Sequence, residues 1–178
     1  MKQLGIRSNE IQKLPLGVQQ EIWASTMDNV ARYPHSVKIN KIGVGDLEER
    51  VLAQYSYARK ELTVSREFFS DHFASSDSLM HQSQTGWHPK SCDTLKSVVD
   101  HEFGHSFSRA AYSQSGRYSS CKKLFDGFQA KDIISGLSTY ATHNVNEFIA
   151  EGWAEYRNSG NPRPMAQQIG KTMELTLR

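Results

Sequence analysis

The sequence has little cysteine, no long apolar run and almost no net charge. Its 178 residues include two cysteines, Cys92 and Cys121, and neither has a C-x-x-C partner for binding a metal. A lone pair leaves one disulfide or two free thiols open, and free thiols are the commoner outcome without a secretory signal. The cysteines therefore predict neither a disulfide scaffold nor a thiolate metal site.

Three further absences exclude classes of protein. No apolar stretch approaches the roughly 20 residues of a membrane-spanning helix. A formal net charge of +2 gives no basis for binding nucleic acid or an anionic membrane surface. The N-terminal residues lack the apolar core of a signal peptide, so the chain as given is not marked for classical secretion.

The residues that are present predict one globular domain. With 38% hydrophobic and 22% charged residues, the composition is ordinary, and we expect 1–178 to form a single domain. An apolar stripe that starts near Pro15 predicts a helix over 15–32. Three segments alternate apolar and polar residues as half-buried strands do: 37–44, 53–57 and 61–65. The link 58–60 has the length of a hairpin turn, so we expect a small, mostly antiparallel sheet.

The middle of the chain predicts a loop and then a buried helix. The polar, Ser-rich stretch 70–86 predicts a mobile surface loop. A helix is expected from about Leu95 to Ala111, with Asp93 or Thr94 as its N-cap. Weaker patterns follow it and predict a loop and then a further helical segment: 113–120 and 121–129.

The predicted helix contains the pattern H-E-x-x-H, made by His101-Glu102-Phe103-Gly104-His105. Residues four apart share one helix face, so His101 and His105 can bind one metal ion, and Zn²⁺ suits a pair of imidazole nitrogens. Glu102 can take a proton from a water on that ion and pass it to the leaving amine of a peptide bond. This arrangement is typical of a zinc metallopeptidase. The alternative is an amphipathic helix with two histidines and a solvated Glu102.

Two features near the pattern bear on its surroundings. Gly104 destabilises a helix by about 1 kcal/mol relative to alanine, so we predict that another backbone passes close to it beneath the metal site. The unit Gly86-Trp87-His88-Pro89 favours a turn anchored by a buried Trp87. The alternative is that Trp87 or His88 shapes a substrate pocket.

A catalytic zinc site needs a third protein ligand, which leaves the fourth position for water. One peptidase class takes that ligand from the pattern H-E-x-x-H-x-x-G-x-x-H. This class is excluded, because Ser108 and Ala111 occupy the positions of its glycine and third histidine. The third ligand must therefore come from elsewhere in the chain.

A second predicted helix, over 144–156, can supply it. Its carboxylates recur at intervals of four along one face: Glu147, Glu151 and Glu155. We predict Glu147 as the third ligand, although its spacing from Asn144 also fits a helix capping box. We predict that Glu151 accepts an N–H from a ligating histidine or, alternatively, ligates the metal itself.

The run Tyr140-Ala141-Thr142-His143-Asn144-Val145-Asn146-Glu147-Phe148-Ile149-Ala150-Glu151, after the H-E-F-G-H helix, resembles the catalytic domain of anthrax lethal factor and the related Pro-Pro endopeptidases. The shared pattern is Y-x-x-x-N-x-x-E-F-x-A-E. By this resemblance Glu147 is the third zinc ligand of a gluzincin-type site, and Tyr140 stabilises the oxyanion of the tetrahedral intermediate. It also implies a zincin-like α+β fold, in which a small, mostly antiparallel sheet packs against the active-site helix and a C-terminal ligand-bearing helix.

A second resemblance covers about 53–156. Gly86-Trp87-His88-Pro89 and Lys96-Ser97-Val98-Val99-Asp100-His101 are similar to segments of metallopeptidase domains at the C-terminal ends of phage minor head proteins. Residues 1–50 match neither group and are expected to form a helical and strand lead-in to the core at 53–156.

The sequence thus predicts a zinc endopeptidase that acts on a peptide or protein, with no nucleic-acid or membrane partner. Its expected location is cytoplasmic, virion-associated or reached by non-classical export. Two alternatives stay open: a non-catalytic, metal-stapled assembly module of a phage particle, and a toxin-type protease with a single host target. The sequence does not predict an oligomeric state.

Overall fold

The structure is a computed structural model that describes residues 5–37, 39–114 and 117–177, with 109–114, 117–118 and 176 described as backbone only. Its α-helices are α1 (Leu16–Arg32), α2 (His72–Gln84), α3 (Leu95–Gln114), α4 (Arg117–Gly127), α5 (Ala130–Gly136), α6 (Val145–Asn158) and α7 (Pro164–Leu177). Its strands are β1 (Lys41–Gly45), β2 (Ala53–Ser56) and β3 (Glu61–Ser65). Short 3₁₀ turns lie at η2 (Ile11–Lys13), η3 (Phe68–Ser70) and η4 (Tyr140–Thr142). The predicted α+β class is confirmed.

The three strands form a mixed sheet in the order β1-β3-β2. The predicted hairpin is confirmed, since β2 and β3 pair antiparallel with Ala53 opposite Val64. However, β1 pairs parallel to β3, with Lys41 opposite Glu61, so the expectation of a mostly antiparallel sheet is wrong for one of the two pairings. The physical reason is that β3 inserts between β1 and β2, which local alternation does not encode. The strand predicted over 37–44 is shifted to β1, and residue 38 lies outside the described residues.

The stretch 70–86 is a helix and not the predicted loop. The Asp71 carboxylate caps α2 by accepting the N–H groups of Phe73 and Ala74 at 3.0 and 3.1 Å. The helix has little apolar periodicity, because Phe73 is 83% exposed and Leu79 is its one buried large apolar side chain. A Ser-rich helix that buries so little apolar surface resembles a loop in its sequence.

The connection after the motif helix is also shorter than predicted. Helix α3 continues to Gln114 and α4 already begins at Arg117, so the loop expected over 113–120 is wrong outside 115–116, which are not described. The predicted helix over 121–129 falls mainly within α4. Cys92 and Cys121 are both free and buried, as expected for thiols rather than a disulfide.

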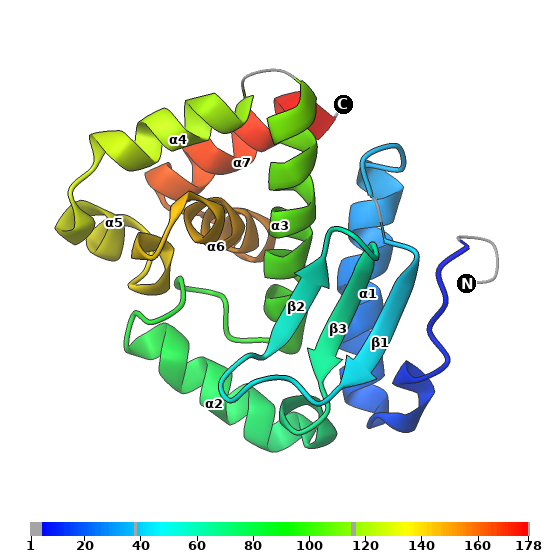
Figure 1. The fold of residues 1–178 in the computed structure, drawn as a ribbon. Coiled ribbons are helices and arrows are strands. Elements are labelled where there is room, and N and C mark those ends of the chain that lie inside the picture. Colours follow the sequence, from blue (N-terminus) through cyan, green and yellow to red (C-terminus); the bar gives the residue numbers. More distant parts are fainter. Residues whose placement is uncertain (1–4, 38, 115–116, 178) are drawn as a thin grey trace.

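Helix α3 lies at the centre of the molecule, between the sheet and α6 (Figure 1). On the α6 side, Phe107 packs edge-on against Trp153, with ring centroids 5.3 Å apart in the core. A Cβ on Gly104 would lie 2.8 Å from the Ala150 Cα, so the predicted close backbone approach is confirmed. This contact brings the two predicted ligand-bearing helices together. No helix in the described ranges is long and apolar enough to cross a membrane.

Candidate metal centre

The start of α3 sets the position of the H-E-x-x-H residues. Of the two predicted N-caps, Thr94 accepts the N–H of Ser97 on its Oγ1 at 3.2 Å. Two turns later His101 and His105 stand one above the other, with ring centroids 4.7 Å apart. The helix therefore presents both imidazoles on one face, as the spacing predicts.

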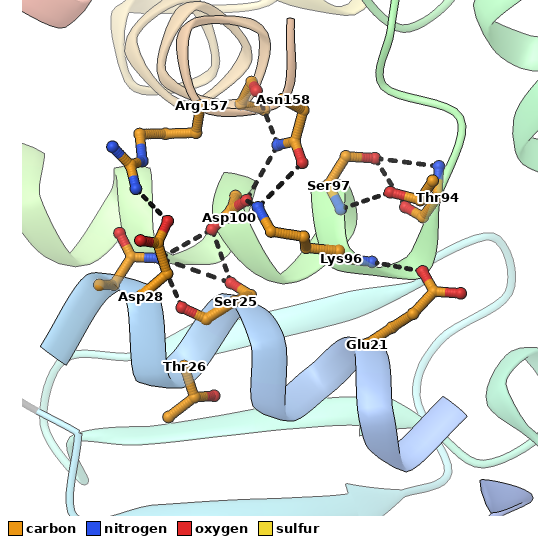
Figure 2. A network of polar contacts seen from close by, with 12 residues as sticks. Glu21, Ser25, Thr26, Asp28, Thr94, Lys96, Ser97, Asp100, Arg157 and Asn158 are labelled. Carbon is orange, nitrogen blue, oxygen red and sulfur yellow. Dashed lines mark hydrogen bonds and ion pairs between the residues drawn. The ribbon is translucent and has the colours of Figure 1, made fainter. Parts of the chain in front are cut away.

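A buried polar network fixes α3 beside His101 (Figure 2). Asp100 is fully buried and accepts hydrogen bonds from Ser25 at 2.6 Å and Asn29 at 2.7 Å, both on α1. Its other oxygen accepts from Lys96 at 2.6 Å and from Asn158 of α6 at 2.9 Å. One carboxylate thus joins three helices next to the site, a role that the sequence did not indicate.

The atoms of three predicted ligands converge. Glu147 Oε2 lies 3.1 Å from His101 Nε2 and 3.4 Å from His105 Nε2. Ligands of a tetrahedral Zn²⁺, with bonds of about 2.0–2.1 Å, are separated by about 3.3 Å. Glu147 Oε2 is also buried and makes no aligned hydrogen bond within the described part of the chain. The residues present therefore fit a zinc ion.

The start of α6 is capped by the side chain of Asn144 and not by that of Glu147. Asn144 Oδ1 accepts the N–H groups of Asn146 at 2.9 Å and of Glu147 at 3.1 Å, and so caps α6. The Glu147 carboxylate is turned to the histidines. Burial raises its pKa, but the adjacent His101 and His105 outweigh burial and hold the pKa far below its usual value.

Glu102 offers a second carboxylate near the same histidines. It is buried, and its oxygen and one nitrogen of each of His101 and His105 all lie within 4.8 Å of one another. Both carboxylates are therefore within reach of a metal ion bound to the two histidines. Glu147 Oε2 approaches the Nε2 atoms of both rings, at 3.1 and 3.4 Å, and is the carboxylate that we take as the candidate third ligand.

Tyr140 lies close to His101. Its ring centroid is 6.0 Å from that of His101. Burial raises the pKa of Tyr140 to about 12, and the charges of Glu147, Glu151 and Glu102 add to this effect. The side chain is therefore a phenol at neutral pH and can donate a hydrogen bond.

Glu151 is 1% exposed, and several hydrogen-bonding groups surround its carboxylate. Its carboxylate lies 2.8 Å from His101 Nδ1, 3.1 and 3.3 Å from His88 Nδ1, and 2.7 Å from Ser138 Oγ. Burial raises its pKa, but the contacts with His88 and His101 lower it to about 2. Glu151 contacts the Nδ1 atom of His101, whereas Glu147 contacts the Nε2 atom of the same ring. This position suits a group that orients His101.

Sequence reasoning gave no role to Ser138 or to the contact between His88 and Glu151. The Gly86–Pro89 unit indicated His88 only as an alternative for shaping a pocket, and no local pattern predicted a role for Ser138. The third carboxylate of the row, Glu155, is structural: Arg163 Nε lies 3.0 and 3.1 Å from its oxygens. The same guanidinium donates to the carbonyl of Leu137, which ties down the segment before η4.

A cavity of about 790 Å³ opens beside these residues. His101, Glu102 and Tyr140 line one part of it. Apolar side chains line much of the rest: Val51, Leu52, Ala53, Phe68, Leu79, Val98 and Ala154. Trp87 is 41% exposed and lines the cavity together with His88, so the favoured turn with a buried tryptophan is wrong and the pocket alternative describes the unit better.

Comparisons of the chain with family models, with curated proteins and with solved structures gave no match. The resemblances to lethal factor and to phage head proteins therefore stay predictions from the quoted motif residues. What the site can do follows from its geometry.

Proposed function

We propose that the protein is a zinc-dependent endopeptidase of the gluzincin type. The observation that supports this most directly is the convergence of His101, His105 and Glu147, with the carboxylate of Glu102 beside them. Zinc held by these three ligands would polarise the scissile carbonyl and lower the pKa of an attacking water. Two imidazoles and one carboxylate form a ligand set of catalytic zinc sites.

The chain's own groups have distinct roles in this proposal. Glu102 takes a proton from the attacking water and then delivers it to the leaving amine. Tyr140 donates its phenol O–H to the oxyanion that develops on the carbonyl oxygen. Glu151 accepts the Nδ1–H of His101, which keeps the Nε2 lone pair of that ring directed at the ligand site.

The surroundings support an extended peptide as the substrate. Strand β2 is an edge of the sheet, and Ala53 at its start lines the cavity. Tyr57, just after β2, donates to the carbonyl of His105 at 3.0 Å, which holds this edge beside α3. A free strand edge can bind a peptide by backbone hydrogen bonds, while apolar cavity walls accept its side chains.

A metal that only staples helices would explain less of this arrangement. A structural site uses four protein ligands and needs neither a free carboxylate at Glu102 nor an adjoining cavity. A phage-assembly protease and a toxin-type protease would share the proposed chemistry and differ in target alone.

The test is cleavage of an acetylated and amidated decapeptide library by zinc-loaded variants. We expect Glu102→Gln to keep its zinc and lose about 10²–10⁴-fold in kcat, because the general base is removed. Tyr140→Phe should keep its zinc and lose about 10²–10³-fold, since one oxyanion donor is lost. Equal cleavage by wild type and Glu102→Gln would overturn the proposal.

A further inference from the structure

Glu151 contacts two imidazoles, and only one of them belongs to the proposed metal site. His101 and His88 each direct Nδ1 at its carboxylate, at 2.8 Å and at 3.1 to 3.3 Å. Because an ionised carboxylate only accepts hydrogen bonds, each ring carries its proton on Nδ1 and donates it. In the neutral form, the Nε2 of each ring is then a lone-pair acceptor.

The Nε2 of His88 has no partner among the described residues. It is not one of the buried polar atoms left without a hydrogen bond, so it is open to solvent, although the side chain is only 16% exposed. The ring lines the cavity, and its centroid is 5.6 Å from that of Tyr140. Because Nδ1 is directed at Glu151, Nε2 is the polar atom of the ring that is left for a group in the cavity.

The backbone around His88 is fixed on both sides. Trp87 donates its N–H to the carbonyl of Gln82 at 2.9 Å, and Tyr140 donates to the carbonyl of Trp87 at 3.1 Å. Gly86, with a φ of 76°, supplies the left-handed turn that this path needs. His88 and Tyr140 are thus held in one unit, and the Nε2 position is set before any ligand enters.

We infer that His88 contacts the substrate, and that its Nε2 accepts a backbone N–H of the peptide in the cavity. This inference rests on the proposed function. A peptide N–H that leaves water must find an acceptor. The carboxylates of Glu147 and Glu151 already lie against histidines, whereas His88 Nε2 has no partner among the described residues and its ring lies beside that of Tyr140.

Two variants separate the two nitrogens of His88. In His88→Asn the side-chain amide can still donate to Glu151, but no group reaches into the cavity. In His88→Gln the longer side chain returns an acceptor to the position of Nε2. Both are made with Glu102→Gln, loaded with zinc, and titrated calorimetrically with the decapeptide that the wild type cleaves fastest.

We expect His88→Asn to bind this peptide about tenfold more weakly, which corresponds to one lost hydrogen bond, and His88→Gln to recover most of the loss. Zinc content should be equal in all three proteins. The backbone nitrogens of the peptide are then methylated one at a time. At one position we expect the methyl group to weaken binding to the Glu102→Gln protein but not to its His88→Asn variant.

Two results overturn the inference alone: unchanged peptide binding by His88→Asn, or a loss of zinc that accounts for its weaker binding. In either case wild-type cleavage and its dependence on Glu102 would be intact. If the wild type cleaves no peptide and the Glu102→Gln protein binds none of the library, the proposed function and the inference are both overturned.

Discussion

At the scale of single residues, the structure separates the roles of two glutamates one turn apart on α6. Glu147 faces the Nε2 atoms of both histidines, whereas Glu151 faces the Nδ1 atom of His101. The first position suits a ligand, and the second suits a group that orients a ligand.

Zinc affinity should follow this order. We expect Glu147→Gln to weaken zinc binding more than 100-fold, because a charged ligand is lost, and Glu151→Gln to weaken it about 10–100-fold. Competition with a chromogenic chelator measures both constants. A greater loss in Glu151→Gln than in Glu147→Gln would make Glu151 the ligand.

Part of the site could be predicted at this scale and part could not. His101 and His105 are four residues apart in one helix, so their spacing alone predicts a shared face, with Glu102 adjacent in sequence. Glu147 needed a second helix with the correct periodicity. His88 and Ser138 meet Glu151 only through tertiary packing, and no local spacing encodes such contacts.

At the scale of secondary-structure elements, the site depends on close packing of α3 against α6. Gly104 makes this possible, because a side chain there would overlap Ala150. Two kinds of substitution, one steric and one electrostatic, test how α3 is held.

Gly104→Ala should destabilise the protein by about 1–3 kcal/mol, although alanine favours a helix by about 1 kcal/mol. The reason is the 2.8 Å approach to the Ala150 Cα, where backbone must move. Gly127→Ala is the matched control, since nothing lies within 4 Å of a Cβ there, and it should change stability by less than about 0.5 kcal/mol. Urea unfolding measures both, and equal values would contradict the packing argument.

Asp100→Ala should destabilise the fold by about 3 kcal/mol or more, because Lys96 and three neutral donors lose a buried acceptor. The exposed pair of Lys122 and Asp126 has the same i,i+4 spacing, so Asp126→Ala should cost less than about 1 kcal/mol. Denaturant unfolding compares the two variants. A similar cost for both would show that the network around Asp100 is not a structural anchor.

The elements themselves differ in how well their sequence predicts them. Helices α1 and α6 bury one face and carry clear periodicity, and the β2–β3 hairpin has a short turn between alternating segments. Helix α3 has weak periodicity and was predicted from its buried apolar residues around the H-E-x-x-H pattern. Helix α2 was missed because it buries little apolar surface. The parallel pairing of β1 was missed because the alternation of apolar and polar residues does not specify which strand pairs with which, or in which direction.

At the scale of the whole molecule, the proposed metal centre joins parts of the chain that are distant in sequence. The helix with the two histidines also contacts α1 through Asp100, and the segment with His88 contacts the segment with Tyr140 through backbone hydrogen bonds. None of these contacts involves a metal ion. We expect the apo protein to be folded and zinc to add stability by mass action.

The central claim is that His101, His105 and Glu147 bind one zinc ion. Elemental analysis of protein reconstituted with zinc and then freed of loose metal tests it most directly. The account predicts one zinc per wild-type chain and almost none in His105→Ala with a retained fold. No bound zinc in the wild type, or one zinc in both proteins, would contradict it.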